Sequence, residues 1–287
     1  MRAVALHEDV IVFVSDMWQT TCTALRGDDE GFVIDSPLYP EELRALPEVL
    51  EQSKFPVSGL LATHGDWDHL LGRLAFPDAA LGGAESTVAR VNGEPGDAQR
   101  RLRTFDEEHY VPDRGPLGLG ALQGLPVPGR LEVGTRGGPA AAEREQSEGG
   151  TGEAEAGREL EMLPADGHTG DGAAYWLPWV RVLVCGDYLS PVEIPMISAD
   201  SGGTLAAYRA ALARFSGYVE QAEWVVPGHG APLSGTRAAE ILREDDEYLA
   251  ELQRQPASAR PPASRGGTAT QQRIHDANVA AVTGATA

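Results

Sequence analysis

The sequence is short of lysine and cysteine, and it has no long apolar run. Lys54 is the single lysine among 287 residues, and Cys22 and Cys185 are the two cysteines. Two cysteines make no disulfide framework, and both lie in apolar, strand-like stretches, so we expect reduced thiols in the core. No stretch approaches the roughly 18 apolar residues of a membrane-spanning helix, so we expect no membrane partner.

The chain also lacks positive charge. It carries 23 basic and 43 acidic residues, for a formal net charge of −20. Binding along a nucleic-acid backbone needs clustered Lys and Arg, so we expect no nucleic-acid partner and instead a small-molecule substrate. The hydrophobic fraction of 42% is typical of a globular protein with a large core.

The N-terminal stretch does not have the pattern of a secretory signal. "MRAVALHEDVIVFVSD" places His7, Glu8 and Asp9 where a signal peptide needs an apolar stretch. We therefore expect a cytoplasmic protein. The sequence leaves open whether it is a monomer or a homodimer.

The first third of the chain alternates between strand and helix patterns. β-Rich stretches at 10–15, 20–26 and 31–35 predict three strands, and leucines spaced by three and four predict a helix over 40–52. A short apolar run at 58–63 predicts a buried strand that leads into "HGDWDH". The carboxyl end of such a strand is where α/β sheets usually hold their functional residues.

The second half repeats this alternation after an interruption. Segment 135–157 has almost no large apolar residue, and we interpret it as a flexible surface insertion. Strand patterns then resume, and helix patterns follow over 204–219 and 236–255. We expect one domain over 1–255, followed by a linker and C-terminal tail over 256–287.

The densest group of chemically active residues is "THGDWDH". It places His64, Asp66, Asp68 and His69 within six residues, directly after a buried strand. Alternating residues at a strand-to-helix turn can point to one side, and imidazole and carboxylate are both good ligands for divalent first-row metals. The spacing therefore predicts a metal-binding loop.

Three further candidate ligands follow strand-like runs in loops rich in Gly or Asp. They are His168 in "GHTGDG", Asp187 in "CGDYL" and His229 in "PGHG". Strand ends hold side chains stiffly, so these residues strengthen the prediction of a metal site.

These motifs, in this order, resemble those of the metallo-β-lactamase superfamily, and the resemblance runs from about Val10 to Gln255. It implies a four-layer αββα sandwich of the α/β class, with two divalent metal ions at one edge of the two sheets. It also implies that Asp35, in "FVIDSP", supports the metal loop without binding metal. The implied ligands are His64, Asp66 and His168 for one metal, Asp68, His69 and His229 for the other, and Asp187 as the bridge.

Asp66 departs from the usual first motif of the family, His-x-His-x-Asp-His, because it stands at the second histidine position. We expect zinc, but a carboxylate is harder than imidazole and anionic, which shifts metal preference toward Fe or Mn and makes these the alternatives. The di-iron flavodiiron branch of the superfamily also has a carboxylate at this position. The competing interpretation is that Asp66 only forms hydrogen bonds.

The resemblance implies a metal-dependent hydrolase, in which a metal-bound hydroxide attacks an ester, thioester, lactone or similar acyl substrate. Asp68 or Asp66 would orient this nucleophile. Trp67 and Tyr188 are candidate substrate-pocket residues, each with a core role as the alternative. Three other functions remain open: a phosphodiesterase of the same fold, an iron-dependent oxidoreductase using the same dinuclear site, and a non-enzymatic metal-binding protein.

Overall fold

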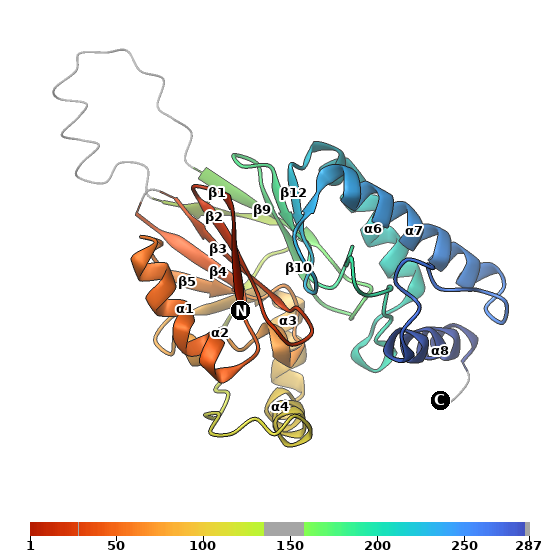
Figure 1. Cartoon of the computed structure of the whole chain (residues 1–287), viewed down its shortest axis with the longest axis horizontal. Helices are drawn as coiled ribbons and strands as arrows, with labels where there is room; N and C mark the ends of the chain where they lie inside the picture. The colour runs from red at the N-terminus through yellow and green to blue at the C-terminus, as the bar shows by residue number, and fades with distance from the viewer. Residues whose placement is uncertain (28, 135–157, 285–287) are drawn as a thin grey trace, which may run out of the picture.

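The computed structural model describes residues 1–27, 29–134 and 158–284. Two β-sheets pack face to face, and helices cover the outer face of each sheet (Figure 1). The predicted four-layer αββα sandwich is therefore confirmed. The insertion predicted at 135–157 lies outside the described residues, and the division at residue 255 stays a prediction.

The first sheet has seven strands in the order β1 to β7. The first four form an antiparallel meander, and β4, β5, β6 and β7 run parallel. Parallel neighbours need crossovers, and short helices supply them on the outer face. The strands are β1 (Arg2–His7), β2 (Val10–Val14), β3 (Thr21–Arg26), β4 (Gly31–Asp35), β5 (Gly59–Leu61), β6 (Leu81–Ala84) and β7 (Leu122–Leu125).

Among the helices on the outer face of the first sheet, α1 buries a clear apolar stripe. In α1 the stripe is Leu43, Leu46 and Leu50, all of which are buried. Their spacing by three and four residues places them on one side of a helix, so the prediction from the leucine pattern is confirmed. The helices are α1 (Pro40–Gln52), α2 (Gly72–Ala75), α3 (Glu85–Gly93) and α4 (Asp97–Glu108).

The second sheet has six strands, in the order β13, β12, β11, β10, β9, β8. Only the β11–β12 pair is parallel among the described pairs of this sheet. Its strands are β8 (Gly129–Val133), β9 (Arg158–Pro164), β10 (Ala173–Leu177), β11 (Val182–Val184), β12 (Trp224–Val226) and β13 (Leu233–Ser234).

The helices on the second sheet are capped by hydroxyl side chains. Thr204, Ser234 and Thr268 each accept a hydrogen bond from a backbone N–H in the first turn of the helix that follows. In Figure 1 these helices lie on the side of the molecule opposite α1. They are α6 (Leu205–Gln221), α7 (Gly235–Arg254) and α8 (Ala269–Thr283).

The core between the sheets explains why some strands are apolar throughout. All five residues of β10 are buried, because one face contacts the first sheet and the other contacts the α6–α7 layer. Trp176 packs toward the helices, whereas Tyr175 lies in the cluster between the sheets. None of the helices in the described residues is long and apolar enough to cross a bilayer.

Candidate metal centre

The loop that follows β5 carries four of the predicted ligands. Leu61 ends the strand, and a short 3-10 turn, η1 (Trp67–His69), closes the loop. Asp66 precedes this turn in an extended conformation, and His64, Asp66, Asp68 and His69 are all buried. The loop thus turns its polar side chains inward, where only a binding partner can compensate for their burial.

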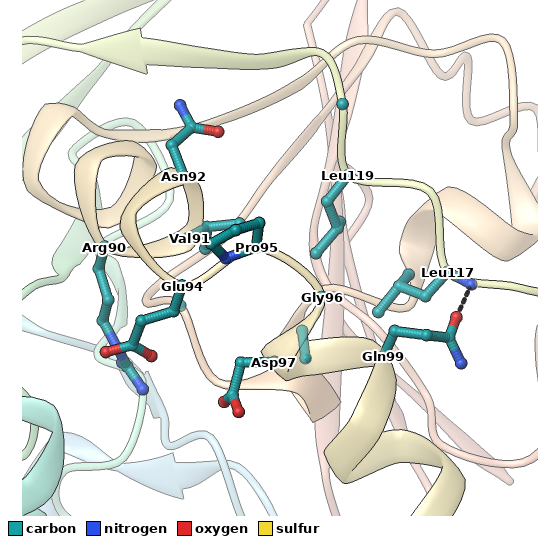
Figure 2. Close-up of a pocket in the computed structure, with 13 residues that line it drawn as sticks. Arg90, Val91, Asn92, Glu94, Pro95, Gly96, Asp97, Gln99, Leu117 and Leu119 are labelled. Atoms are coloured by element: carbon teal, nitrogen blue, oxygen red, sulfur yellow. Dashed lines mark hydrogen bonds between the residues drawn. The ribbon is translucent and has the colours of Figure 1, made fainter.

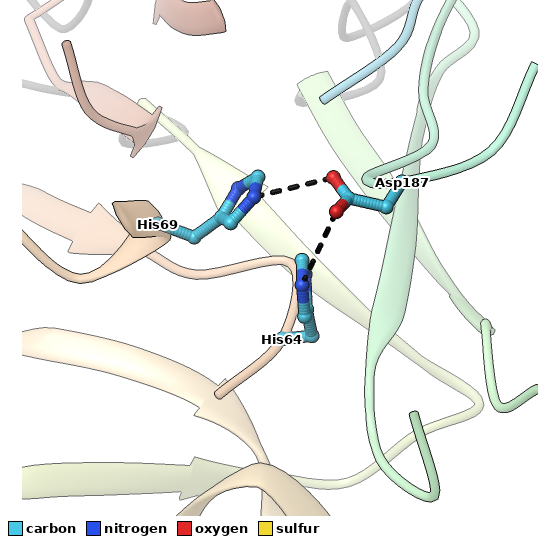
Figure 3. A group of neighbouring side chains, drawn as sticks. All are labelled: His64, His69 and Asp187. Atoms are coloured by element: carbon cyan, nitrogen blue, oxygen red, sulfur yellow. Dashed lines mark ion pairs between the residues drawn. The ribbon is translucent and has the colours of Figure 1, made fainter. Parts of the chain in front are cut away.

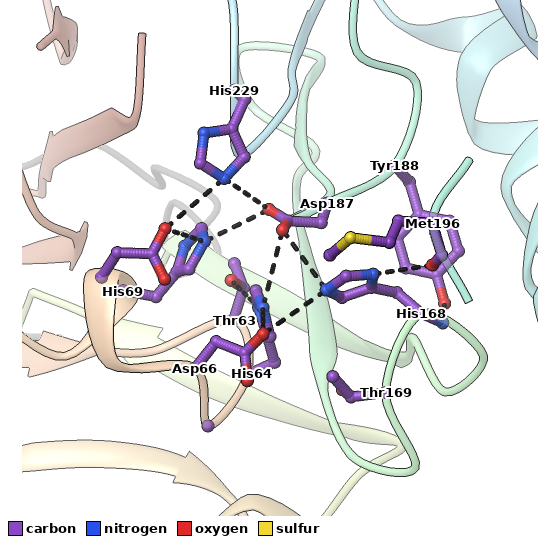
Figure 4. Close-up of polar contacts among 12 residues, drawn as sticks. Thr63, His64, Asp66, His69, His168, Thr169, Asp187, Tyr188, Met196 and His229 are labelled. Carbon is purple, nitrogen blue, oxygen red and sulfur yellow. Dashed lines mark hydrogen bonds and ion pairs between the residues drawn. The ribbon is translucent and has the colours of Figure 1, made fainter. Parts of the chain in front are cut away.

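The structure brings all seven predicted ligands together (Figure 4). The first sheet supplies the β5 loop, whereas the second sheet supplies the loops after β9, β11 and β12. Within each of three groups, the candidate ligand atoms all lie within 4.8 Å of one another. The groups are His64, Asp66 and His168; Asp68, His69 and His229; and His64, His69 and Asp187.

Asp187 lies between the first two groups and faces each with a different oxygen. Its Oδ2 is 3.8 Å from Nε2 of His64 and 3.4 Å from Nε2 of His168. Its Oδ1 is 3.2 Å from Nε2 of His69 and 3.5 Å from Nε2 of His229. Figure 3 shows both oxygens, one toward His64 and one toward His69. This is the position that a bridging carboxylate needs.

Gly228 makes room for the Asp187 carboxylate. A Cβ atom at this position would lie 2.1 Å from Asp187 Oδ1 and 3.0 Å from an atom of the His69 ring. Any larger residue would have to displace them, so the first glycine of "PGHG" is required by close approach.

His168 and His229 are oriented by backbone carbonyl groups. Nδ1 of His168 lies 2.8 Å from the carbonyl oxygen of Met196, and Nδ1 of His229 lies 3.1 Å from that of Trp18. Since a carbonyl only accepts hydrogen bonds, we assign the proton of each neutral ring to Nδ1. In its neutral form, each ring then turns an unprotonated Nε2 toward the cluster.

Asp35 orients the other two histidines. Its Oδ2 lies 3.0 Å from Nδ1 of His69 and accepts a hydrogen bond from the Thr63 hydroxyl at 2.9 Å. That hydroxyl lies 3.1 Å from Nδ1 of His64. Asp35 itself has a φ of 58°, a conformation uncommon for a residue with a side chain. The supporting position predicted for Asp35 matches these contacts.

Four buried histidine ring nitrogens form no hydrogen bond among the described residues; one of them is Nδ1 of His69, whose contact with Asp35 is at an ion-pair distance. Nε2 of His64, His69 and His168 is buried without a hydrogen bond among the described residues, and so is Oδ1 of Asp187. Buried polar atoms are normally paired. A histidine held through one nitrogen, with the other left free in a cluster of carboxylates, is typical of a metal ligand. The residues present therefore fit a divalent metal.

The pKa values of the cluster reflect the close packing of opposite charges in the metal-free chain. Burial alone would raise the pKa of the Asp187 carboxyl, but His229, His69 and His64 hold it well below the usual value. Burial alone would lower the pKa of His229, but Asp187, Glu193 and Asp68 raise it to about 10. Protons thus occupy the places that a cation would take.

Asp66 divides its two oxygens between the cluster and an arginine. Oδ2 lies 3.7 Å from Nε2 of His64 and 3.6 Å from Nε2 of His168, whereas Oδ1 accepts a hydrogen bond from Arg90 at 2.5 Å. Burial opposes ionisation, yet His168 and His64 hold the pKa of this carboxyl well below its usual value. Asp66 therefore presents one anionic oxygen where the usual motif has an imidazole nitrogen.

The two candidate pocket residues are both buried beside the cluster. Trp67 packs against the rings of Trp18 and Phe105 in the core of the first layer. The hydroxyl of Tyr188 donates to the Ala165 carbonyl and accepts from the backbone N–H of His168, each at 3.0 Å. These contacts match the core roles that the sequence left as alternatives.

Sequence reasoning missed the polar residues that surround the ligands. Arg90 sits on a helix with no motif of its own, and Asp171, although part of "GHTGDG", received no role. Glu193 also faces the cluster, and burial raises the pKa of its carboxyl. Of these three residues, only Asp171 lies in a sequence motif that could have indicated its role.

A cavity of about 230 Å³ lies beside the metal loop (Figure 2). Gly65 and Arg90 form its wall toward the cluster, and Pro95, Leu117 and Leu119 are among its other lining residues. None of the seven candidate ligands is among the described residues that line it.

Comparison with known proteins agrees with this geometry. The family model of the metallo-β-lactamase superfamily matches residues 15–252. No match was found among curated proteins. Similar solved structures include a metallo-β-lactamase family protein from Thermus thermophilus (19% identity, 88% of this chain and 83% of that chain, TM-score 0.63). A metallo-β-lactamase from Pontibacter korlensis is similar at 15% identity (84% and 98% covered, TM-score 0.53).

The stereoselective inverting sec-alkylsulfatase Pisa1 from Pseudomonas sp. is also similar, at 14% identity and a TM-score of 0.68. The match covers 98% of this chain but 49% of that protein, so the chain spans about half its length. At these identities the solved structures establish the fold alone. The family model covers most of the sequence, and the chain therefore belongs to the metallo-β-lactamase superfamily.

Proposed function

We propose that the chain is a metal-dependent hydrolase that binds two divalent metal ions, with zinc as the leading candidate. The observation that carries this proposal is the placement of Asp187, which turns one oxygen to each of two histidine-containing groups. The unpartnered Nε2 atoms of His64, His69 and His168 support it.

Bound metals would supply Lewis acidity and lower the pKa of a bound water toward neutrality. The chain supplies carboxylates to manage the proton of that water. Asp68 Oδ2 lies 3.6 Å from Nε2 of His69 and 3.5 Å from Nε2 of His229. Asp68 would orient the attacking water, with Asp66 as the alternative.

We infer an uncharged acyl substrate, such as an ester, thioester or lactone. Asp68, Asp187 and Glu193 gather at the cluster, and their carboxylates disfavour a substrate with several negative charges. The loop that carries Glu193 is otherwise largely apolar, with Ile194 and Met196 beside the cluster. Phosphodiester hydrolysis is the alternative, because a phosphodiester carries a single negative charge and is repelled less than a polyanion.

One observation favours a second function. The carboxylate of Asp66 is a harder ligand than imidazole, which suits iron. An iron-dependent oxidoreductase using the same residues is the alternative, and it would require an electron-donating partner.

The test combines metal analysis with substrates of several classes. Protein purified without added metal should contain about two divalent ions per chain, and chelation should abolish turnover of p-nitrophenyl acetate, thioesters or lactones. Asp187→Ala should lose both metal and activity. Hydrolysis of bis(p-nitrophenyl) phosphate in preference to every acyl compound would replace the acyl proposal, and a metal-free, inactive protein would refute the hydrolase.

A further inference from the structure

Arg90 occupies an enclosed position behind the metal loop. It lies on α3, and its side chain is 12% exposed. The guanidinium donates to Oδ1 of Asp66 at 2.5 Å, to Oδ1 of Asp171 at 2.8 Å and to the hydroxyl of Ser201 at 2.8 Å. A single cation thus contacts three segments that are far apart in the sequence.

These contacts join the two loops that supply the first group of candidate ligands. Asp171 belongs to the same loop as His168, and its Oδ2 accepts a hydrogen bond from the backbone N–H of Gly65 at 2.9 Å. Gly65 separates His64 from Asp66. Arg90 and Asp171 therefore fix the metal loop against the loop after β9, through the planar donor arrangement that arginine provides and lysine lacks.

We propose that Arg90 is a positioning residue that leaves Asp66 as a ligand with one available oxygen and a partly offset charge. This inference rests on the proposed metal-dependent function. Oδ1 of Asp66 is occupied by the guanidinium, so Oδ2 alone is free to face a metal near His64 and His168. Arg90 also pairs with Asp171, so the guanidinium offsets the charge of Asp66 in part.

This arrangement has a consequence for the metal. A free carboxylate would bring one negative charge and two oxygens to the first site, which favours harder ions such as Mn or Fe. Arginine removes one oxygen from use and offsets part of the charge, so the site favours zinc more than a free carboxylate would. The departure of Asp66 from the usual motif is thus partly compensated by a residue on another element.

Arg101 provides the matched control. Its Nη1 lies 3.5 Å from the same Asp66 oxygen, but its side chain is 47% exposed. Exposed ion pairs at this distance contribute little. Arg101→Gln removes one positive charge near Asp66 while leaving the buried contacts of Arg90 in place.

The experiment measures metal selectivity without substrate. Wild-type protein, Arg90→Gln, Arg90→Lys and Arg101→Gln are each equilibrated with equal zinc and manganese, and the bound metals are quantified by mass spectrometry. Outer contacts of metal ligands typically change affinity by about 10–100-fold, so Arg90→Gln should lower the bound Zn:Mn ratio roughly 10-fold or more. Arg90→Lys keeps the charge and should lower the ratio less, and Arg101→Gln should leave it unchanged.

A second background separates ligand positioning from simple bracing of the fold. In Asp66→His there is no carboxylate to compensate, so Arg90→Gln should no longer lower the Zn:Mn ratio. The same drop in both backgrounds, or an unchanged ratio in Arg90→Gln, would overturn the inference. Thermal unfolding of each variant reports whether it is folded, and Arg90→Lys still decides the question if Arg90→Gln does not fold.

Asp66→Ala distinguishes failure of the Arg90 inference from failure of the proposed function. If Asp66→Ala loses metal while Arg90→Gln keeps the wild-type ratio, only the role of Arg90 is wrong. If Asp66→Ala keeps full metal content, Asp66 is not a ligand, and the positioning role of Arg90 is wrong as well. If neither the wild type nor any variant binds metal, the proposed function is wrong as well.

Discussion

The four histidines of the cluster are held by three kinds of partner: backbone carbonyls, a carboxylate and a hydroxyl. Asp35 is the most connected of these partners, because it contacts His69 directly and His64 through Thr63. It also accepts the backbone N–H of Thr63 at 2.8 Å. One buried carboxylate thus sets the orientation of a ligand in each metal group.

Asp35→Asn should therefore weaken metal binding at both groups while keeping the side-chain shape. The amide has one acceptor oxygen instead of two, so it cannot serve His69 and Thr63 together. We expect metal affinity to fall about 10–100-fold, measured by competition with a chromogenic chelator. Asp106→Asn is the control: Asp106 is also buried but pairs with Arg114, away from the cluster. It should lower stability without changing affinity, and equal affinity losses in both variants would contradict the role of Asp35.

Metal uptake should depend on pH because protons and metals compete for the same nitrogens. In the metal-free chain the pKa of His229 is raised to about 10: burial lowers it, but Asp187, Glu193 and Asp68 outweigh burial. Metal affinity should therefore rise as pH increases from 6 toward 10, with release of protons that calorimetry in buffers of different ionisation enthalpy detects. A pH-independent affinity would contradict this account.

The stability of the metal-free chain should fall as pH rises, whereas metal affinity should increase. A histidine whose folded-state pKa lies above its unfolded value of about 6.5 stabilises the fold fully below that pH. This contribution is lost as pH rises through about 10, so metal-free protein should unfold at lower urea concentration at pH 9 than at pH 6. Urea titrations at both values, with and without zinc, provide the check.

The sequence predicted the seven clustered residues because each follows a strand in a loop whose composition is unusual. It could not predict Arg90, because an arginine on an amphipathic helix looks like any other solvated residue until the fold places it behind Asp66. The roles of Trp67 and Tyr188 were open for a related reason. Whether an aromatic side chain lines a pocket or fills a core depends on distant partners such as Phe105 and Ala165.

Among the elements, those with strong periodicity were predicted and those with short or polar patterns were not. The leucines of α1 and the apolar run of β10 gave clear signals. The edge strand β1 was missed, because its apolar signal is weak: only Val4 and Leu6 are half-buried, and the strand is held by its pairing with β2. The strand β6 was also missed, since "LGGA" is stabilised by neighbouring parallel strands rather than by its own propensity.

Helix α8 shows what sequence patterns can overlook at the end of a chain. The sequence indicated a linker and tail over 256–287, but the structure shows a helix whose Asn278 is fully buried. Its side chain accepts the N–H of Ile197 and donates to the carbonyl of Pro195. Met196, between these two residues, holds His168. A helix from the C-terminal segment therefore supports a ligand of the metal cluster.

Asn278→Ala should loosen the loop around Met196. It leaves the Ile197 N–H and Pro195 carbonyl without partners in a buried setting, which costs about 1–3 kcal/mol. We expect lower stability in urea unfolding and weaker metal binding, because the carbonyl that orients His168 becomes mobile. Arg273→Ala truncates an exposed side chain on the same helix and should leave both quantities nearly unchanged. Unchanged metal affinity in Asn278→Ala would show that α8 does not support the metal centre.

For the chain as a whole, the open question is whether residues 256–287 form an appendage, as their composition suggests, or part of the fold. Arg265 lies within this segment, and its side chain is 1% exposed. It pairs with Asp245 on α7 at 2.6 Å and donates to the carbonyls of Ser190 and Glu193. The segment thus reaches the same loop that borders the metal cluster.

Truncation after Gln255 should therefore destabilise the remaining chain instead of merely shortening it. Asp245 would lose its buried partner, and breaking such a pair costs about 3–5 kcal/mol.

Burial already raises the pKa of Asp245 to about 7 against the opposing effect of Arg265. A raised carboxyl pKa makes the folded state bind more protons than the unfolded state, so stability falls as pH rises. Without Arg265 this fall should extend above pH 7, and the difference in urea midpoint between the two chains should widen there. Arg265→Met in the full chain should show the same pH trend with a smaller loss. A truncated chain with a wild-type midpoint would instead show that 1–255 is a complete domain with a dispensable tail.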